Sequence, residues 1–104
     1  LDYLRQNDEL LRLLTEAKNE KLSHHKRNQS EHLLKNFNEG YINFPPTFKF
    51  DKGSLIYDTS RKARVPSWTD RILWQDNIAS TKLLEYDAKF NVSFSDHIPV
   101  YGLF

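Results

Sequence analysis

The chain of 104 residues contains no cysteine, so it can form neither a disulfide nor a thiolate metal site, which fits a reducing compartment. It also has no large excess of one charge, since 15 Lys and Arg residues stand against 14 Asp and Glu residues. Bulk charge therefore does not predict a nucleic-acid or membrane-surface binder. No apolar run is long enough to cross a bilayer, and no secretory signal, repeat or low-complexity segment is visible. We expect one small cytoplasmic domain or part of one.

The front of the chain favours helices. Apolar residues recur every three to four positions from Asp2 to Lys18 and predict one amphipathic helix. A second short helix is expected over Glu31 to Asn38, with Gly40 well placed to end it.

Between these two helices, the stretch from Asn19 to Ser30 is basic and has a single apolar residue, so it reads as a solvated connection. The adjacent His24 and His25 lack an acidic or thiol partner four residues on. Neighbouring side chains point apart on a helix, which favours an exposed basic loop over a metal site.

After Gly40 the pattern changes to strands and turns. The Pro45-Pro46 pair excludes a helix, and Asp51 to Ser54 predict a turn. Four strands are expected, at Thr47–Phe50, Arg71–Trp74, Lys82–Tyr86 and Ile98–Phe104. A mainly helical part (1–39) followed by strands and loops (40–104) predicts an α/β fold with an α+β-like arrangement.

Two polar pairs stand at the start of apolar runs and could carry chemistry. Asp70-Arg71 and Asp96-His97 provide carboxylates, a guanidinium and an imidazole, which can bind phosphate and move protons. Each pair also has a structural explanation: Asp70 and Arg71 could form a local ion pair, and Asp96 and His97 a hydrogen-bonded one. The catalytic interpretation requires Asp70 to reach His97 and hold one of its ring nitrogens.

Cations are in local excess between residues 49 and 71. Asp58-Thr59-Ser60 can cap a turn that holds the basic residues that follow, as a phosphate-binding loop would require. Composition alone favours an ordinary solvated loop, and it favours core packing for the nearby Phe48, Phe50 and Tyr57. The cations are Lys49, Lys52, Arg61, Lys62, Arg64 and Arg71.

Three segments in this order resemble the inositol polyphosphate 5-phosphatases: Pro46-Thr47-Phe48-Lys49-Phe50, the stretch from Tyr57 to Leu73 that contains Pro66-Ser67-Trp68-Thr69-Asp70-Arg71, and Ser95-Asp96-His97-Ile98-Pro99-Val100. Residues 38–44 also resemble the segment that leads into that family's substrate strand. The resemblance implies an endonuclease/exonuclease/phosphatase-like fold, similar to the deoxyribonuclease I and apurinic endonuclease superfamily, with two facing sheets flanked by helices. It also implies that the whole chain is the C-terminal portion of a catalytic domain and therefore a partial sandwich.

The same resemblance implies magnesium-assisted attack of water on a phosphoester of inositol phosphates or of phosphoinositides at a membrane surface. His97 would contact the scissile phosphate, Asp70 would orient its imidazole, and Asp96 would lie beside the Mg²⁺ ion and the water. No residue is assigned as a metal ligand. Predicted contacts to the substrate come from Lys49, Lys62 and Arg64, which would hold the neighbouring phosphate, and from Arg71 and Phe48. Arg71 could support either the phosphate or the geometry of Asp70.

The sequence also departs from that family. Phe48 replaces a frequent Tyr and Ile98 a frequent Arg, which removes a hydroxyl and a charge from the region. The family's metal-binding Glu and its Gly-Asp-x-Asn-x-Arg motif do not occur in the chain. We therefore expect the chain alone to be inactive and to need an upstream half as its partner. The alternatives are a non-catalytic remnant that still binds phosphoinositides and, less favoured, a nuclease of the same superfamily.

Overall fold

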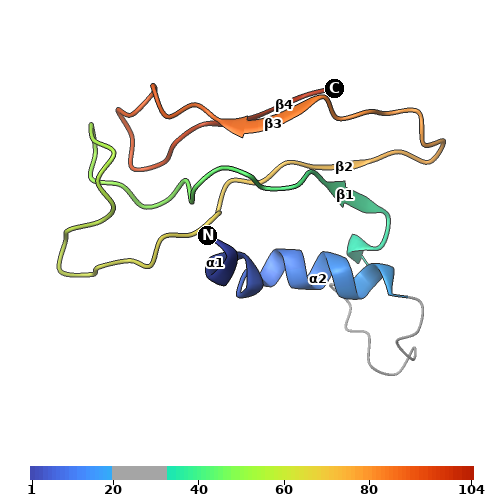
Figure 1. Ribbon diagram of the computed structural model, residues 1–104, viewed down its shortest axis with the longest axis horizontal. Coiled ribbons are helices and arrows are strands. Elements are labelled where there is room, and N and C mark those ends of the chain that lie inside the picture. Colours follow the sequence, from blue (N-terminus) through green and yellow to red (C-terminus); the bar gives the residue numbers. More distant parts are fainter. Residues whose placement is uncertain (20–32) are drawn as a thin grey trace. The chain divides into compact units, whose positions relative to one another are not determined.

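The computed structural model describes residues 1–19 and 33–104 (Figure 1). The chain forms two compact units: Leu1–Asn38 with Leu73–Ser80, and Glu39–Ile72 with Thr81–Phe104. The described residues include the helices α1 (Asp2–Gln6) and α2 (Glu9–Lys18), a helical pair at residues 33–34, and four strands. The strands are β1 (Phe37–Glu39), β2 (Leu73–Gln75), β3 (Glu85–Ala88) and β4 (Val100–Leu103).

The expectation of one helix from Asp2 to Lys18 is wrong, because the helix is interrupted at Asn7 and Asp8. Asp8 adopts an extended backbone, and its carboxylate accepts a 2.8 Å hydrogen bond from the Leu11 amide, which starts α2 afresh. The apolar spacing nevertheless identifies the buried face of α2, since Leu14 and Ala17 are the buried residues of this helix. An N-cap therefore overrides a continuous apolar pattern here.

The predicted second helix is confirmed at residues 33–34, but its C-terminal end is wrong, because Phe37–Glu39 forms strand β1 and pairs with β2. Gly40 follows a strand and ends no helix. A Cβ atom at Gly40 would lie 2.3 Å from Cδ2 of Leu83 and 2.9 Å from Cδ1 of Tyr86, so close packing requires glycine there. Residues 31–32 of that helix, and the basic connection with His24 and His25 except Asn19, lie outside the described residues.

Three of the four strands predicted after Gly40 exist with displaced bounds, and the strand predicted at Thr47–Phe50 is wrong. Strands β2, β3 and β4 begin two or three residues after the predicted starts at Arg71, Lys82 and Ile98. The predicted strand Thr47–Phe50 is reduced to isolated bridges at Phe48 and Phe50. The predicted turn is confirmed, since the Ser54 amide donates to the Asp51 carbonyl at 3.1 Å.

Two small sheets organise the strands, as expected for an α/β fragment. Strands β3 and β4 are antiparallel, with Glu85 opposite Leu103 and Ala88 opposite Val100. The core of the second unit is mainly aromatic and aliphatic, and the rings of Phe44 and Tyr86 pack edge to face with their centroids 5.3 Å apart. Its buried hydrophobic residues are Ile42, Phe44, Phe50, Trp68, Tyr86 and Ile98.

Candidate active site

Backbone pairing joins the three segments that resemble the 5-phosphatases. Phe48 forms antiparallel bridges with both Ser67 and His97. The amides of Phe48 and Ser67 donate to each other's carbonyls at 3.2 and 2.8 Å, and the Ile98 amide donates to the Thr47 carbonyl at 2.9 Å. Residues from positions 47, 67 and 97 are therefore neighbours in space, all within the second unit.

The imidazole of His97 and the carboxylate of Asp70 are in direct contact. Nδ1 of His97 lies 2.8 Å from Oδ2 of Asp70, and the two side chains are 43% and 35% exposed. The same oxygen accepts hydrogen bonds of 3.1 Å from the hydroxyls of Thr47 and Thr69. An ionised carboxylate can only accept, so it selects the imidazole form that carries its proton on Nδ1.

This arrangement leaves Nε2 of His97 facing away from the carboxylate. Within residues 1–19 and 33–104, Nε2 makes no hydrogen bond, so it is the nitrogen available to a substrate. The ring of Phe48 lies over the imidazole with a centroid separation of 4.5 Å and an interplanar angle of 32°. Phe48 is therefore placed to hold the imidazole, a contact that sequence patterns did not indicate.

A cavity of about 570 Å³ opens beside this pair. Its lining includes both Asp70 and His97. Thr69, Arg71 and Ser95 are further polar residues of the lining, and Phe94 and Val92 are on its apolar side. A cavity that combines apolar walls with a few convergent polar groups is the usual form of a small-molecule site. The contact between Asp70 and His97 therefore lies where a ligand could reach it.

Asp96 adjoins this cavity in sequence but is tied to its own segment. Its Oδ1 accepts a 3.3 Å hydrogen bond from the Ser95 hydroxyl, and its carbonyl accepts one of 2.9 Å from the Phe50 amide. The described part of the chain contains no group of three or more His, Cys, Asp or Glu side chains that could hold a metal ion. These residues do not by themselves fit a magnesium centre, so the Mg²⁺ requirement stays a prediction.

The basic loop is built on two aspartates. The carboxylate of Asp58 accepts hydrogen bonds from the amides of Ser60 at 2.9 Å and Arg64 at 3.0 Å. Hydrogen bonds from the Ser60 hydroxyl, then from these two amides, lower the pKa of Asp58 to about 2. Asp51 accepts from the Thr59 hydroxyl at 2.6 Å. The expected role of Asp58 in capping this turn is thereby confirmed.

The three cations predicted to hold the neighbouring phosphate differ in exposure. Lys62 and Arg64 are exposed, whereas the side chain of Lys49 is 27% exposed and its Nζ lies 3.9 Å from Oδ2 of Asp58. The backbone of the loop is thus fixed, while two of its cations remain accessible to a ligand.

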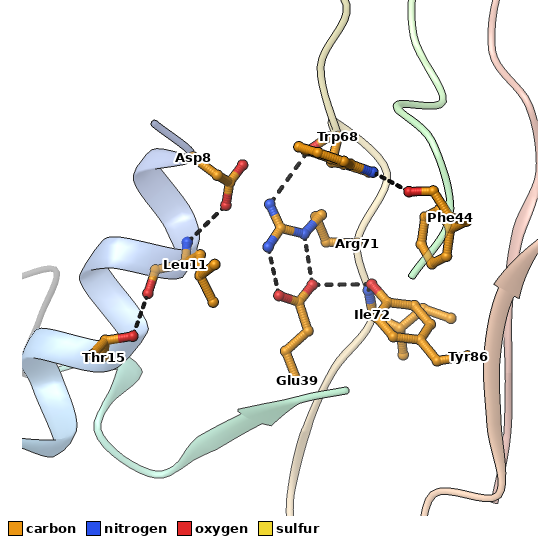
Figure 2. A network of polar contacts seen from close by, with 9 residues as sticks. All are labelled: Asp8, Leu11, Thr15, Glu39, Phe44, Trp68, Arg71, Ile72 and Tyr86. Atoms are coloured by element: carbon orange, nitrogen blue, oxygen red, sulfur yellow. Dashed lines mark hydrogen bonds and ion pairs between the residues drawn. The ribbon is translucent and has the colours of Figure 1, made fainter. Parts of the chain in front are cut away.

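Arg71 occupies a different environment, shown in Figure 2. Its guanidinium forms a two-pronged ion pair with Glu39, and the two side chains are only 6% and 3% exposed. The hydroxyl of Tyr86 donates to the same carboxylate at 3.0 Å. Of the two roles expected for Arg71, this burial favours support of the Asp70 segment over contact with a phosphate. Sequence reasoning missed Glu39 and Tyr86, because neither is near Arg71 in the sequence.

Comparison with known proteins agrees with this geometry. The family model described as endonuclease/exonuclease/phosphatase family 2 matches residues 1–103, so the chain belongs to that family. Within it, the relatives are inositol polyphosphate 5-phosphatases. INP51, the phosphatidylinositol 4,5-bisphosphate 5-phosphatase of Saccharomyces cerevisiae, is 52% identical over 65% of this chain and 7% of its own length. Inositol polyphosphate 5-phosphatase K of Mus musculus is 42% identical over 73% of this chain and 20% of its own length.

A solved structure extends the likeness to the fold. The inositol polyphosphate 5-phosphatase domain of SPsynaptojanin, in complex with inositol (1,4)-bisphosphate and calcium ion, matches with a TM-score of 0.59 and 48% identity. The match covers 64% of this chain and 19% of that domain's chain. The predicted fold class is confirmed. The chain spans a fifth or less of the length of each of these relatives. No helix in the described residues is long and apolar enough to cross a membrane.

Proposed function

We propose that the chain supplies the histidine and phosphate-binding side of an enzyme that removes the 5-phosphate from inositol phosphates or phosphoinositides. The observation that carries this proposal is the contact of 2.8 Å between His97 and Asp70 at the wall of a cavity. The proposed substrate class is that of the 5-phosphatases to which the chain is 42–52% identical. A nuclease of the same superfamily is less favoured, because these relatives are 5-phosphatases.

In this proposal, His97 acts on the scissile phosphate through Nε2. The imidazolium form donates a hydrogen bond from Nδ1–H to Asp70 and a second one from Nε2–H to a phosphoryl oxygen. The carboxylate of Asp70 compensates the ring's positive charge and fixes its orientation, as the acid of a hydrolase triad does. Developing negative charge on the phosphoryl oxygens is thereby stabilised by a donor that is already in place. Asp96 is proposed to position the attacking water, and no step is assigned to a metal ion.

The basic loop is proposed to select a substrate with a phosphate next to the 5-position. Lys49, Lys62 and Arg64 would contact that phosphate, and Nζ of Lys49 also lies 3.9 Å from Oδ2 of Asp58. The hydrogen bonds that Asp58 accepts from the Ser60 and Arg64 amides hold the loop before the ligand arrives, which reduces the entropy lost on binding.

A binding titration of the 104-residue chain tests the substrate assignment. NMR shifts are followed while inositol phosphates that carry the 5-phosphate, with or without the 4-phosphate, are added. Replacing one exposed cation, Lys62→Ala, is expected to weaken binding of the 4-phosphate form by roughly twofold to fivefold. The matched control Lys52→Ala is expected to leave the affinity unchanged. Equal effects of both variants on both ligands would contradict the assignment of Lys62.

An activity assay tests the catalytic part. The chain alone with Mg²⁺ is expected to release no appreciable phosphate, because the described residues lack a ligand cluster for the metal. Joined to an upstream half that carries the Gly-Asp-x-Asn-x-Arg motif, it is expected to turn over, and His97→Ala is expected to abolish turnover. Phosphate release by the chain alone, lost in His97→Ala, would overturn the first expectation. Binding without turnover in the joined protein would instead favour a non-catalytic phosphoinositide-binding remnant.

A further inference from the structure

The segment from Trp68 to Ile72 carries Asp70, and a single buried set of side chains holds it on both sides. These side chains are Glu39, Arg71 and Tyr86, called here the Glu39 network (Figure 2). Arg71 binds Glu39 through its guanidinium, and Tyr86 binds Glu39 through its hydroxyl. Their contacts converge on the backbone around Asp70.

On the N-terminal side of Asp70, the network holds Trp68. Nη1 of Arg71 approaches the Trp68 carbonyl at 3.4 Å, while Nε of Arg71 donates to Oε2 of Glu39 at 2.6 Å. The Trp68 indole is itself anchored, because its Nε1 donates to the Phe44 carbonyl at 2.9 Å and its side chain is buried.

On the C-terminal side, the network holds Ile72 through Tyr86. The Ile72 amide donates to the Tyr86 hydroxyl at 3.1 Å, and that hydroxyl donates to Oε2 of Glu39 at 3.0 Å. The Tyr86 hydroxyl therefore accepts from the Asp70 segment and donates to Glu39 at the same time. Burial, and the nearby Glu39 carboxylate that accepts this proton, raise the pKa of Tyr86 to about 12, so the phenol keeps its proton at ordinary pH.

The geometry of these contacts is restrictive because the network is buried and charged. Glu39 and Arg71 are ionised groups with 3% and 6% of their side chains exposed, and neither can exchange its partner for water. A two-pronged guanidinium–carboxylate pair also fixes orientation as well as distance. Displacement of the Trp68–Ile72 segment would break several of these contacts together.

We propose that Glu39, Arg71 and Tyr86 are positioning residues that hold Asp70 within hydrogen-bonding distance of His97. They act through the backbone on either side of Asp70. The inference rests on the proposed function only where it treats His97 as the reacting group. Its structural content is that the Glu39 network sets which imidazole nitrogen carries the proton.

Two tyrosine variants of the 104-residue chain make a matched test. Tyr86→Phe removes the hydroxyl that joins Ile72 to Glu39 but keeps the ring packed against Phe44. Tyr101→Phe is the control: it removes a hydroxyl that donates to the exposed Glu85 across β3 and β4. Both replacements delete one phenolic hydroxyl that is hydrogen-bonded to a glutamate. Only the Tyr86 hydroxyl also contacts the Asp70 segment.

The readout is the tautomer of the neutral His97 ring, read from two-bond ¹H–¹⁵N couplings and assigned through His97→Gln. Wild type and Tyr101→Phe are expected to carry the proton mainly on Nδ1. In Tyr86→Phe the ratio of Nδ1–H to Nε2–H is expected to fall by roughly threefold or more, the change that loss of one hydrogen bond produces. A merely destabilised protein would lose signal through unfolding and would not change the tautomer ratio of its folded fraction.

Arg71→Lys is a second, independent variant for the case in which Tyr86→Phe does not fold. It keeps the positive charge opposite Glu39 but loses the two-pronged contact and the approach to the Trp68 carbonyl, so it is also expected to lower the ratio. A wild-type tautomer ratio in the folded variant or variants would overturn the proposal. Because the measurement needs no turnover, failure of this inference is distinguishable from failure of the proposed enzymatic function.

Discussion

The loop at Asp58 and the Glu39 network each pair acidic and basic side chains, and they use them in opposite ways. Asp58 directs its oxygens to the backbone amides of Ser60 and Arg64, and the arginine side chain stays exposed. Glu39 directs its oxygens to the guanidinium of Arg71, which is thereby withdrawn from solvent. The Arg64 side chain is available to an anion because Asp58 accepts hydrogen bonds from backbone amides. The Arg71 side chain is not, because Glu39 binds its guanidinium. Counting cations in the sequence overestimates how many can contact phosphate.

The largest expected effect comes from breaking the buried pair. Arg71→Met leaves the Glu39 carboxylate buried without its cation, which is expected to lower the free energy of unfolding by about 3–5 kcal/mol. Urea denaturation followed by circular dichroism measures this change in the free energy of unfolding. Arg12→Met is the control, because its pair with Glu16 lies on the surface of α2 and contributes only about 0.3–0.5 kcal/mol.

A paired replacement sharpens the same comparison. Glu39→Leu combined with Arg71→Met removes both charges, and most of the lost stability is expected to return, because burial of apolar side chains replaces the ion pair. Equal denaturation midpoints for Arg71→Met and Arg12→Met would show that burial does not separate the two kinds of pair.

An intermediate effect is expected at Asp70, which is itself only partly exposed. Asp70→Ala removes the acceptor of the Thr47 hydroxyl, and Thr47 is 0% exposed, so the donor is left buried without a partner. The expected loss is about 1–3 kcal/mol in the free energy of unfolding, measured by the same denaturation. Adding Thr47→Val removes the unsatisfied donor and is expected to recover much of that loss. No recovery would mean that Thr47 is not the source of the cost.

The smallest expected effect is local and depends on pH. The pKa of Asp58 is lowered from 3.8 to about 2, so its ionised form is favoured by the folded loop. The contribution of Asp58 is therefore present above pH 3.8 and is lost as the pH falls through 2. The Ser60 and Arg64 amide signals are expected to shift over that range in an NMR titration, with little change in the thermal midpoint. Asp58→Asn is expected to abolish the titration, and shifts that persist in it would contradict the assignment.

The sequence predicted those parts of the molecule that depend on residues close together in the chain. The turn at Asp51–Ser54 and the loop capped by Asp58 were both anticipated, since their hydrogen bonds join residues at most six positions apart. The sequence does not predict the start of α2 at Asp8, because the apolar period continues across this N-cap residue.

The remaining features depend on pairings between distant segments. Strand β1 forms only because it meets β2, and Arg71 finds its partner 32 positions away at Glu39. The contact between Asp70 and His97 was expected as a requirement of the catalytic interpretation, and the structure contains it. The proposed role of each residue in substrate binding or catalysis stays a prediction, because geometry alone does not measure turnover.

The double bridge of Phe48 to Ser67 and His97 has a consequence for the order in which the molecule folds. The bridges close chain loops of different length, since Ser67 and His97 lie 19 (67 − 48) and 49 (97 − 48) positions from Phe48. Long loops lose more entropy on closure and form contacts later. The turn at Asp58 needs only local contacts and can form early. His97 lies near the C-terminal end of the chain, so its bridge to Phe48 forms later. Folding intermediates would therefore present the cationic loop before the histidine is in place.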